Sequence, residues 1–572
     1  MPGTQGTILL GGYAAKQCPV RTQFDFGPDP AQWIPAPEDQ ARLDAGVAFE
    51  AEVFTDLLGR HPAAVLVDPR ADRDAAIAAT VAAMDDGAPL ILGGWLPDDV
   101  GGARKGRPDI LIAAEGGYLP ADVKHHRNLE SKPKKAAVVA ALDTPAHWQR
   151  AAGWSAATLY RLSDGLQLAH YTRMLQAAGR HPGAHLQWGA VLGTNRLATG
   201  ADLEWVFTWH DLTEPLGFTF SRSRGKARRS LLERYDHEHR FRVLVAEAAR
   251  RAAAGVGRLI VEPVGQPECR TCPYQQTCAD QMGPDEPSTA LTVGGLDVRE
   301  WVALRRMGIT TINDLAALDA TDPVFLDTYH REVSHRGRDH ARSRLAGAAA
   351  RAAMIRDGIA IRRTGSTPVP SADLEIDCDI EWSSEGLVYL WGARVRACGD
   401  ESSAVFVPFA DWTVRDAAAE RALAERFADW VRGLRDLAAM AGRRVRVYHW
   451  SPAEASRLHR ILGGGAEDLL DPDTGVFTDL EQVFNANFLS VHGSSIKVVA
   501  PVFGFNWSAP DAGGALSQSH LELVRSGGDD AQRSRDWLLA YNADDTAALA
   551  AIRDAMNSRR RIFRTQPVKA AS

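Results

Sequence analysis

Long hydrophobic runs are absent from this sequence. Its 572 residues are 45% hydrophobic, an ordinary fraction that argues against a disordered or collagen-like chain. No apolar stretch approaches the ~20 residues that a bilayer-spanning helix needs. The start of the chain also lacks the charged segment and apolar core that mark a signal peptide. We therefore expect a soluble, cytoplasmic protein with no membrane partner, built from roughly two to four domains.

Cysteine is scarce. The six cysteines are Cys18, Cys269, Cys272, Cys278, Cys378 and Cys398. Disulfides are uncommon in cytosolic proteins, so structural bridges are not expected. Three of the cysteines form a Cys-x2-Cys-x5-Cys pattern, a spacing typical of metal ligands. Taken alone, Cys-x2-Cys allows either zinc or an iron–sulfur cluster, whereas Cys378 and Cys398 are expected to be core residues.

Lysine is also rare. Only 9 of the 65 Lys and Arg residues are lysines, and five of them lie between Lys105 and Lys135. The formal net charge of -7 excludes a uniformly basic surface, but enzymes that act on phosphodiesters combine acidic metal sites with local basic patches. The candidate phosphate contacts are Lys132, Lys134, Lys135, Arg222 and Arg224. The alternative is that both basic segments are solvated faces.

The sequence contains no G-x-x-x-x-G-K-[ST] phosphate loop, no internal repeat and no long low-complexity tract. Any unwinding of nucleic acid must then come from a helicase supplied in trans. Loops near residues 283–287 and 364–371 divide the chain into three expected domains, 1–285, 286–365 and 366–572. The middle one is expected to be helical, with an N-cap at Thr311 or Asn313. It resembles a helix-hairpin-helix element, although a simple helical connector fits the pattern as well.

A turn signal at residues 115–117 separates two apolar runs and predicts a β-hairpin. If its loop has two residues, Asp109 lies opposite Asp122, and Lys124 shares the face of Asp122 because strand side chains alternate. Two carboxylates can hold magnesium, while an ammonium group offsets charge or positions water. A further carboxylate, Glu50, is expected from an amphipathic helix. An exposed hairpin with an ordinary salt bridge would show the same residues.

Further motifs favour the metal site. Pro108, Asp109, Asp122 and Lys124 match the PD-(D/E)xK pattern, and Gln167 and Tyr171 match a Q-x-x-x-Y helix motif. Cys18 stands alone near the start, and Cys269, Cys272 and Cys278 follow at the end of the same domain. Together these residues resemble the RecB-like nucleases, in particular the AddB-type and CRISPR-associated members that carry an iron–sulfur staple.

The resemblance implies that residues 1–285 form a restriction-endonuclease-type α/β core. It implies a magnesium or manganese site formed by Glu50, Asp109, Asp122 and Lys124, with Gln167 and Tyr171 contributing to the site or to DNA binding. It also implies a 4Fe–4S cluster on Cys18, Cys269, Cys272 and Cys278. Such a cluster closes a loop of about 250 residues, which stabilises the folded domain by several kcal/mol in the chain-entropy model.

The third domain begins with a regular alternation of acidic and apolar residues. As a strand, it places Asp373, Glu375, Asp377, Asp379 and Glu381 on one face and apolar side chains on the other. Like charges side by side destabilise a strand unless solvent or cations offset them. The acidic face is therefore either solvated or a divalent-metal site.

The elements that follow this strand indicate a fold. Two strand-like runs at 386–396 and 403–409, a helix near 415–441, a strand at 445–450 and a C-terminal helix at 536–556 are expected. This order resembles a ribonuclease-H-like fold of the DEDD exonuclease superfamily, in its YprB-like branch. The D-x-E first motif of that family aligns here with Glu375 and Asp377, with the two acids exchanged. The remaining site residues that the resemblance implies are Glu454, Tyr541 and Asp545, with Asp479 as another candidate.

The sequence as a whole thus predicts an α/β multidomain nuclease. The expected activity is that of a metal-dependent DNA exonuclease on single strands or DNA ends, in DNA repair or processing, and therefore associated with the nucleoid. The exchanged acids leave open whether the C-terminal site is active or only binds nucleic acid. Two alternatives remain: a 3'-5' exonuclease on DNA or RNA driven by the C-terminal site, and a non-catalytic nucleic-acid-binding repair factor.

Overall fold

The computed structural model describes residues 6–35, 37–130, 135–198, 203–221, 225–291, 293–508 and 514–564. The chain divides into two compact units, Met1–Met282 and Gly283–Ser572. The helical segment that we expect as a separate domain belongs to the second unit. Within the described residues, no helix is both long and apolar enough to cross a bilayer.

The first unit is built on an eight-stranded sheet with the order β1-β2-β3-β4-β9-β10-β6-β7. Its strands are β1 (Val65–Leu66), β2 (Leu90–Leu92), β3 (Ile110–Ala114), β4 (Gly117–Val123), β6 (Ala137–Ala141), β7 (Gln149–Ala151), β9 (Trp188–Ala198) and β10 (Leu203–Asp211). The sheet is mixed, because β1 with β2 and β4 with β9 are parallel pairs and the other neighbours are antiparallel. Two small hairpin-like sheets pair β5 (Leu129–Glu130) with β8 (Ser155–Ala156), and β11 (Gly217–Ser221) with β12 (Gly225–Arg229).

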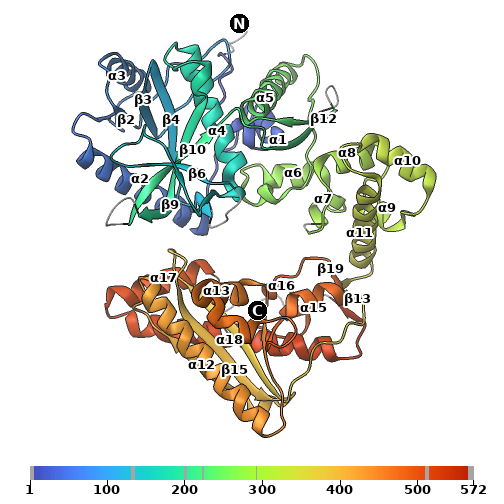
Figure 1. Ribbon diagram of the computed structural model, residues 1–572. Coiled ribbons are helices and arrows are strands. Elements are labelled where there is room, and N and C mark those ends of the chain that lie inside the picture. The colour runs from blue at the N-terminus through green and yellow to red at the C-terminus, as the bar shows by residue number, and fades with distance from the viewer. Residues whose placement is uncertain are drawn as a thin grey trace. The chain divides into compact units, whose positions relative to one another are not determined.

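Figure 1 shows helices packed around this sheet. They are η1 (Ala14–Lys16), α1 (Pro19–Asp25), α2 (Pro37–Arg60), α3 (Arg73–Asp85), α4 (Thr158–Ala177), η2 (Ala184–Leu186), α5 (Leu231–Ala253), η3 (Pro267–Thr271) and α6 (Gln275–Met282). Val53 of α2 packs with Ile110 and Ile112 on one face of β3. Met174 of α4 packs with Leu111 on the other face. The strand period of two therefore separates a face covered by α2 from a face covered by α4.

The predicted hairpin is β3 and β4. Ala114 pairs with Gly117, so the loop has two residues, and Ile110 pairs with Ala121. The next pair outward in this register is Asp109 with Asp122. Because side chains alternate, Asp122 and Lys124 point away from Ala121 and toward the face covered by α4. The hairpin thus brings the two carboxylates and the lysine to one end, as the sequence predicts.

The second unit begins with α7 (Pro287–Ala290), α8 (Val298–Arg306), α9 (Ile312–Ala317), α10 (Pro323–Glu332) and α11 (Arg338–Arg356). Asp297 and Glu300 form a capping box at the start of α8. Gly308, at φ +86°, provides the left-handed turn after that helix. Thr311 caps α9 through the amide of Asp314. The helix–Gly–helix pattern and its Thr311 cap are therefore as expected.

A five-stranded sheet with the order β16-β15-β14-β17-β18 forms the centre of the rest of the unit. Its strands are β14 (Leu374–Trp382), β15 (Val388–Ala397), β16 (Val405–Ala410), β17 (Val445–His449) and β18 (Phe477–Asp479). The first three form an antiparallel meander, and β17 and β18 run parallel to β14 and to each other. A three-stranded sheet pairs β13 (Ile359–Arg363) with β19 (Phe488–Ser490) and β20 (Ile562–Arg564).

The helices of this α/β part lie on both faces of the five-stranded sheet. They are η4 (Glu401–Ser403), α12 (Ala417–Met440), α13 (Ala453–Leu462), η5 (Gly463–Ala466), α14 (Glu467–Leu470), α15 (Leu480–Asn487), α16 (Ile496–Val502), α17 (Gly514–Ser526) and α18 (Ala531–Asn557). Phe427 of α12 stacks on Trp391 at 4.7 Å, on the apolar face of β14 and β15. α18 packs on the opposite, acidic face of β14.

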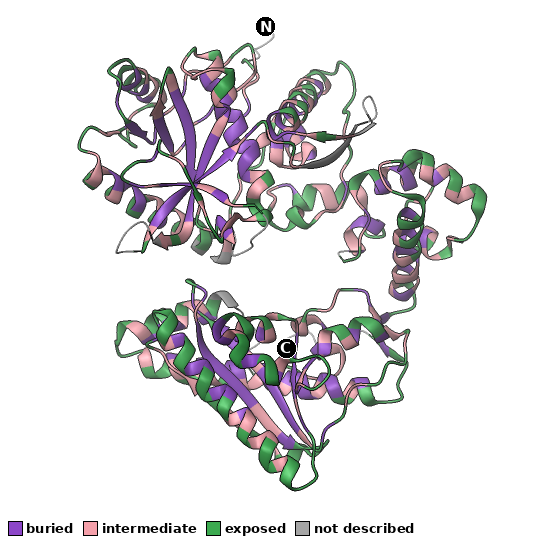
Figure 2. Ribbon diagram, viewed as in Figure 1, coloured by how far each residue is buried: buried purple, intermediate pink, exposed green. Residues whose placement is uncertain are grey.

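The two large sheets form the cores of the two units, because the side chains of their central strands are buried. Figure 2 shows the central strands of each sheet as buried ribbons, while the helices expose one side. In β14 both faces are covered, so that Asp377 is as fully buried as Cys378. The acidic face is therefore not a solvated face, and its charges must be matched inside the protein.

Candidate active sites

The start of the acidic face is an ion-pair network. Arg553 of α18 donates to Glu375 Oε2 at 2.7 Å and pairs with both oxygens of Asp377. Arg396 of β15 donates to Glu375 Oε2 at 2.8 Å. Both carboxylates are thus occupied by buried guanidinium groups. In the structure, Glu375 and Asp377, which the sequence aligns with the first motif, therefore compensate arginine charge instead of lying in an open acidic group.

Further along the same strand, Asp379 and Glu381 present the D-x-E pattern in its ordinary order. One carboxylate oxygen from each of them and one from Asp545 all lie within 4.8 Å of one another. Within the described residues, no other group of three His, Cys, Asp or Glu side chains brings its ligand atoms this close together. Carboxylate oxygens are the ligands that Mg²⁺ and Mn²⁺ prefer. The donor set therefore fits a divalent cation.

Asp379 is positioned by α18. Asn542 Nδ2 donates to Asp379 Oδ2 at 2.7 Å. Gly392 of β15 lies opposite Asp379 in the strand register, and a Cβ atom at this glycine would overlap Asn542 Oδ1. The missing side chain is what lets the helix approach the sheet closely enough for the hydrogen bond.

Asp545 is held by two donors on the same oxygen. Lys497 Nζ lies 2.7 Å and Trp507 Nε1 lies 2.6 Å from Asp545 Oδ1. The Lys497 ammonium is also 3.9 Å from the ring centroid of Trp507 and 4.5 Å from that of Tyr541. A cation over aromatic faces is attracted to them, so Lys497, Trp507 and Tyr541 together fix the orientation of Asp545.

The other predicted residues of this site have different positions. Glu454 is buried at the start of α13, 3.4 Å from His449 Nδ1, and its charge acts on Asp379. Tyr541 lies one helical turn before Asp545 and hydrogen-bonds it. Asp479 instead caps α15, where its Oδ1 accepts from the amide of Gln482 at 3.1 Å.

Burial dominates the electrostatics of the trio. It raises the pKa of Asp379 well above the usual range, and the nearby Asp545 and Glu381 raise it further. Burial and Asp545 likewise raise the pKa of Glu381. Three carboxylates cannot ionise together at this separation without a compensating charge. A bound cation removes that penalty.

The first unit contains a second acidic group, at the open end of the β3–β4 hairpin. Asp122 is fully buried, and its Oδ2 lies 3.2 Å from Lys124 Nζ. Neither of its oxygens has a hydrogen-bond partner of good geometry among the described residues. Asp109 accepts from the amide of Val123 at 2.8 Å. A buried carboxylate with unsatisfied oxygens is costly unless a ligand completes it.

α4 supplies the next residues of this group. Gln167 Nε2 donates to Tyr171 Oη at 3.1 Å. Asp164, one turn earlier on the same helix face, has its Oδ2 3.1 Å from His126 Nε2. Lys16 of η1 donates to Gln167 Oε1 at 2.8 Å. The predicted pair Gln167 and Tyr171 thus meets a lysine from the start of the chain.

Charge interactions connect these side chains. Burial raises the pKa of Asp109, and Asp122 raises it further. Burial opposes ionisation of Lys124, but Asp122 and Asp109 outweigh it and raise the pKa of this lysine. Burial also raises the pKa of Glu50, on which Arg107, Lys124 and Asp122 act. The predicted residues Glu50, Asp109, Asp122 and Lys124 therefore share one electrostatic environment.

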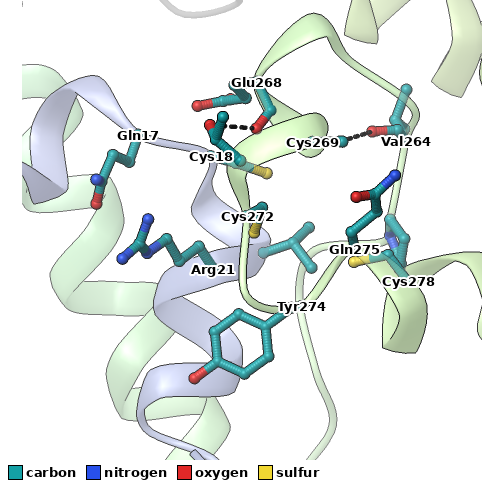
Figure 3. Close-up of a pocket in the computed structure, with 13 residues that line it drawn as sticks. Gln17, Cys18, Arg21, Val264, Glu268, Cys269, Cys272, Tyr274, Gln275 and Cys278 are labelled. Atoms are coloured by element: carbon teal, nitrogen blue, oxygen red, sulfur yellow. Dashed lines mark hydrogen bonds between the residues drawn. The ribbon is translucent and has the colours of Figure 1, made fainter. Parts of the chain in front are cut away.

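Four cysteines line one pocket of about 100 Å³, drawn in Figure 3. Cys18 comes from the N-cap of α1, and Cys269, Cys272 and Cys278 come from residues 267–282. The Arg242 guanidinium donates to the carbonyl of Gln17 at 2.6 Å, and Tyr274 Oη donates to Asp25 at 2.7 Å. Polar contacts thus hold the two distant segments beside each other.

Three thiols of this pocket have raised pKa values. Burial raises the pKa of Cys278 to about 12, and the neighbouring Cys272, Cys18 and Cys269 contribute. Burial also raises the pKa of Cys18 and of Cys269. A thiol loses its proton when it binds a metal, so a metal in this pocket would have to overcome these raised pKa values. Outside the pocket, Cys378 is buried as expected, whereas Cys398 is exposed because it follows β15 in a turn.

Four of the five predicted phosphate contacts lie outside the described residues, namely Lys132, Lys134, Arg222 and Arg224. Lys135 is exposed and pairs with Glu214.

The sequence assigned no specific site role to four residues of these groups, Asp379, Glu381, Asp164 and Lys16. Asp379 and Glu381 lay inside the alternating acidic run, and the ordinary D-x-E order was the signal that could have identified them. Helical spacing back from Gln167 could have identified Asp164. Lys16 had no signal apart from the rarity of lysine.

A comparison with known protein families found a match, which lies in the second unit. Residues 378–557 match the family model of the RNase_H superfamily. The C-terminal part of the chain is therefore an RNase H-like domain, a class that usually hydrolyses phosphodiester bonds. The match runs from Cys378, within β14, to Asn557 at the end of α18, and so includes Asp379, Glu381 and Asp545. No curated protein and no solved structure matches the chain.

Proposed function

We propose that this protein is a metal-dependent nuclease whose principal site is the trio of Asp379, Glu381 and Asp545. The observation that carries the proposal is the approach of three carboxylate oxygens to within 4.8 Å of one another, inside the segment that matches the RNase_H superfamily. The proposed substrates are DNA single strands or DNA ends, in repair or processing, with RNA as the alternative substrate.

The side chains of the chain divide the work of such a site. Asp379, Glu381 and Asp545 would hold magnesium or manganese, which would supply Lewis-acid chemistry for phosphodiester hydrolysis. Asn542 and Gly392 keep Asp379 in position, and Lys497 and Trp507 keep Asp545 in position. Glu454 adds a fourth carboxylate beside the group. Such preorganisation matters, because a misplacement of about 1 Å can cost a factor of 10² in rate.

The test compares purified full-length variants on end-labelled single- and double-stranded DNA and on RNA, with magnesium or manganese. Asp379→Asn and Asp545→Asn should lower cleavage by at least about 10²-fold, because each removes a ligand charge. Asp529→Asn, an exposed aspartate just before α18, is the matched control and should cleave like the wild type. Full activity in both site variants would refute the assignment.

The first unit provides a second candidate site for the same chemistry. Asp122 is buried with both oxygens unsatisfied within the described part of the chain, and it stands beside Asp109, Lys124 and Glu50. These residues support a RecB-like PD-(D/E)xK site, with Gln167 and Tyr171 on its border. A separate Asp122→Asn variant, and its combination with Asp379→Asn, assigns the activity to either unit. If Asp122→Asn leaves all cleavage unchanged while Asp379→Asn removes it, the first unit is not a nuclease.

We further propose that Cys18, Cys269, Cys272 and Cys278 bind a 4Fe–4S cluster that joins the ends of the first unit. The common pocket of the four cysteines supports this proposal. Anaerobically purified protein should contain about four iron atoms per chain and absorb in the visible range. Stoichiometric zinc without iron would contradict it and favour a zinc site instead. A helicase partner and nucleoid association remain predictions.

A further inference from the structure

Lys16 lies near both the cysteine pocket and the acidic group of the first unit, which are formed by residues far apart in the sequence. It lies two residues before Cys18, in the segment that the cysteine pocket anchors, and its ammonium lies at the acidic group of the first unit. Its Nζ donates to Gln167 Oε1 at 2.8 Å, and Gln167 donates in turn to Tyr171. Burial lowers the pKa of Lys16 to about 8, Lys124 lowers it further, and the nearby carboxylates of Asp164, Asp122 and Asp109 oppose this shift.

The backbone around Lys16 is fixed at both ends. The amide of Leu10 donates to Ala103 at 2.9 Å, and the amide of Lys105 donates to Leu10 at 3.0 Å. On the other side, Arg242 of α5 donates to the carbonyl of Gln17. Gly12 lies against Tyr171 and Gln167, where a Cβ atom would come within 3.2 Å of Tyr171 Oη. The segment therefore follows α4 closely and delivers Lys16 to one place.

The two lysines of this site have different partners. The Lys124 ammonium is 3.2 Å from the Asp122 carboxylate, so its charge is largely balanced within the protein. The hydrogen-bond acceptor of Lys16, among the described residues, is the neutral amide of Gln167, and the ring of Tyr13 lies 4.3 Å from its Nζ. The Lys16 charge is therefore available to an incoming anion.

We infer that Lys16 is a phosphate-binding residue, which holds a backbone phosphate of a nucleic acid strand at the first-unit site. The inference rests on the proposed function of that unit. A lysine in this role contacts phosphate without reading sequence. Because Gln167 orients its ammonium and the Cys18 segment positions its backbone, Lys16 connects the cysteine pocket to substrate binding.

The test uses the full-length, anaerobically purified protein and a fluorescent single-stranded oligonucleotide of about 20 nucleotides in calcium, at several salt concentrations. Lys16→Ala should weaken binding by about tenfold, and the slope of log K against log salt should become shallower by about 0.7, the value for one lost phosphate contact on a single strand. Lys16→Arg should retain most of the slope. Arg258→Ala, at an exposed position of the same unit, removes equal charge and should leave the slope unchanged.

Kinetics provide the second readout. In an Asp379→Asn background, which silences the second unit, Lys16→Ala should raise KM about tenfold and change kcat less than threefold, with unchanged iron content. A Lys16→Ala slope equal to that of the wild type, or restoration of binding by Lys16→Gln, would overturn the inference and leave Lys16 a packing residue. If Asp122→Asn shows that the first unit does not cleave, the salt slope still decides whether Lys16 binds phosphate.

Discussion

At the scale of single residues, the geometry of the Asp379, Glu381 and Asp545 trio depends on one glycine. Gly392 is the residue opposite Asp379, and its lack of a side chain lets Asn542 reach that carboxylate. Lysine, rare in this arginine-rich chain, lies at both candidate sites as Lys16, Lys124 and Lys497. An ammonium is a compact charge on a flexible stem, which suits a group that sits among carboxylates.

Gly392→Ala should separate α18 from β14. We expect a loss of about 1–3 kcal/mol in unfolding free energy, the usual cost of overpacking, together with weaker manganese binding. Urea unfolding and manganese titration measure both. Gly433→Ala, within α12 where a Cβ meets nothing within 4 Å, should be neutral or stabilising. If Gly392→Ala matches the wild type in both assays, the close approach of Asn542 is not required.

The buried trio also predicts a pH dependence. Burial raises the folded-state pKa of Glu381 to about 8, and that of Asp379 and Asp545 also lies above its ordinary value. Folding then binds protons, so the associated stability is full below the unfolded pKa of about 4 and disappears as the pH rises toward 8. Unfolding in EDTA from pH 5 to pH 8 should show this decline. Glu381→Gln should make this decline shallower. A wild-type free energy of unfolding that rises from pH 5 to pH 8 would contradict the prediction.

At the scale of elements, β14 places two kinds of acid on one face. Its first part, Glu375 and Asp377, pairs with Arg553 and Arg396, and its last part forms the trio with α18. The alternation that predicts the strand cannot distinguish these parts, because the arginines come from distant segments. The chain order of the strands and helices after β14, the hairpin register and a cap at Thr311 or Asn313 were predictable from local patterns. Which acidic pair joins Asp545 was not, since the tertiary partner of each carboxylate decides its role.

The two parts of β14 should respond differently to neutral substitutions. Asp377→Asn leaves Arg553 without a full counter-charge, and breaking a buried pair costs about 3–5 kcal/mol. Asp379→Asn removes repulsion within the trio and should stabilise the metal-free protein while it abolishes cleavage by the second unit. Thermal unfolding in EDTA, measured beside activity, compares the two variants. If Asp377→Asn is the more stable protein, the assignment of roles along the strand must be reversed.

At the scale of the whole chain, two compact units carry separate acidic groups. The sequence predicts the cysteine pocket of the first unit only by resemblance, because no local pattern connects Cys18 to residues some 250 positions later. The described structure places these segments together through the hydrogen bonds of Tyr274 with Asp25 and of Gln266 with Cys18. A cluster that joins them would restrict the unfolded chain, a contribution of several kcal/mol in the chain-entropy model.

Cys18→Ser should therefore affect one unit and not the other. We expect loss of most bound iron and a lower unfolding temperature for the first unit, with that of the second unit unchanged, as followed by calorimetry and iron analysis. Cys398→Ser, at an exposed cysteine outside the pocket, should match the wild type. Retention of full iron content in Cys18→Ser would show that Cys18 is not a ligand.

The central claim is that Asp379, Glu381 and Asp545 bind the catalytic cation. Manganese binding, followed by electron paramagnetic resonance on the full-length protein, tests it most directly. We predict that Asp379→Asn and Asp545→Asn each lose the tight manganese site of the second unit, in an Asp122→Asn background that removes any contribution from the first. Manganese affinity and stoichiometry equal to those of the Asp122→Asn parent in both variants would contradict the account.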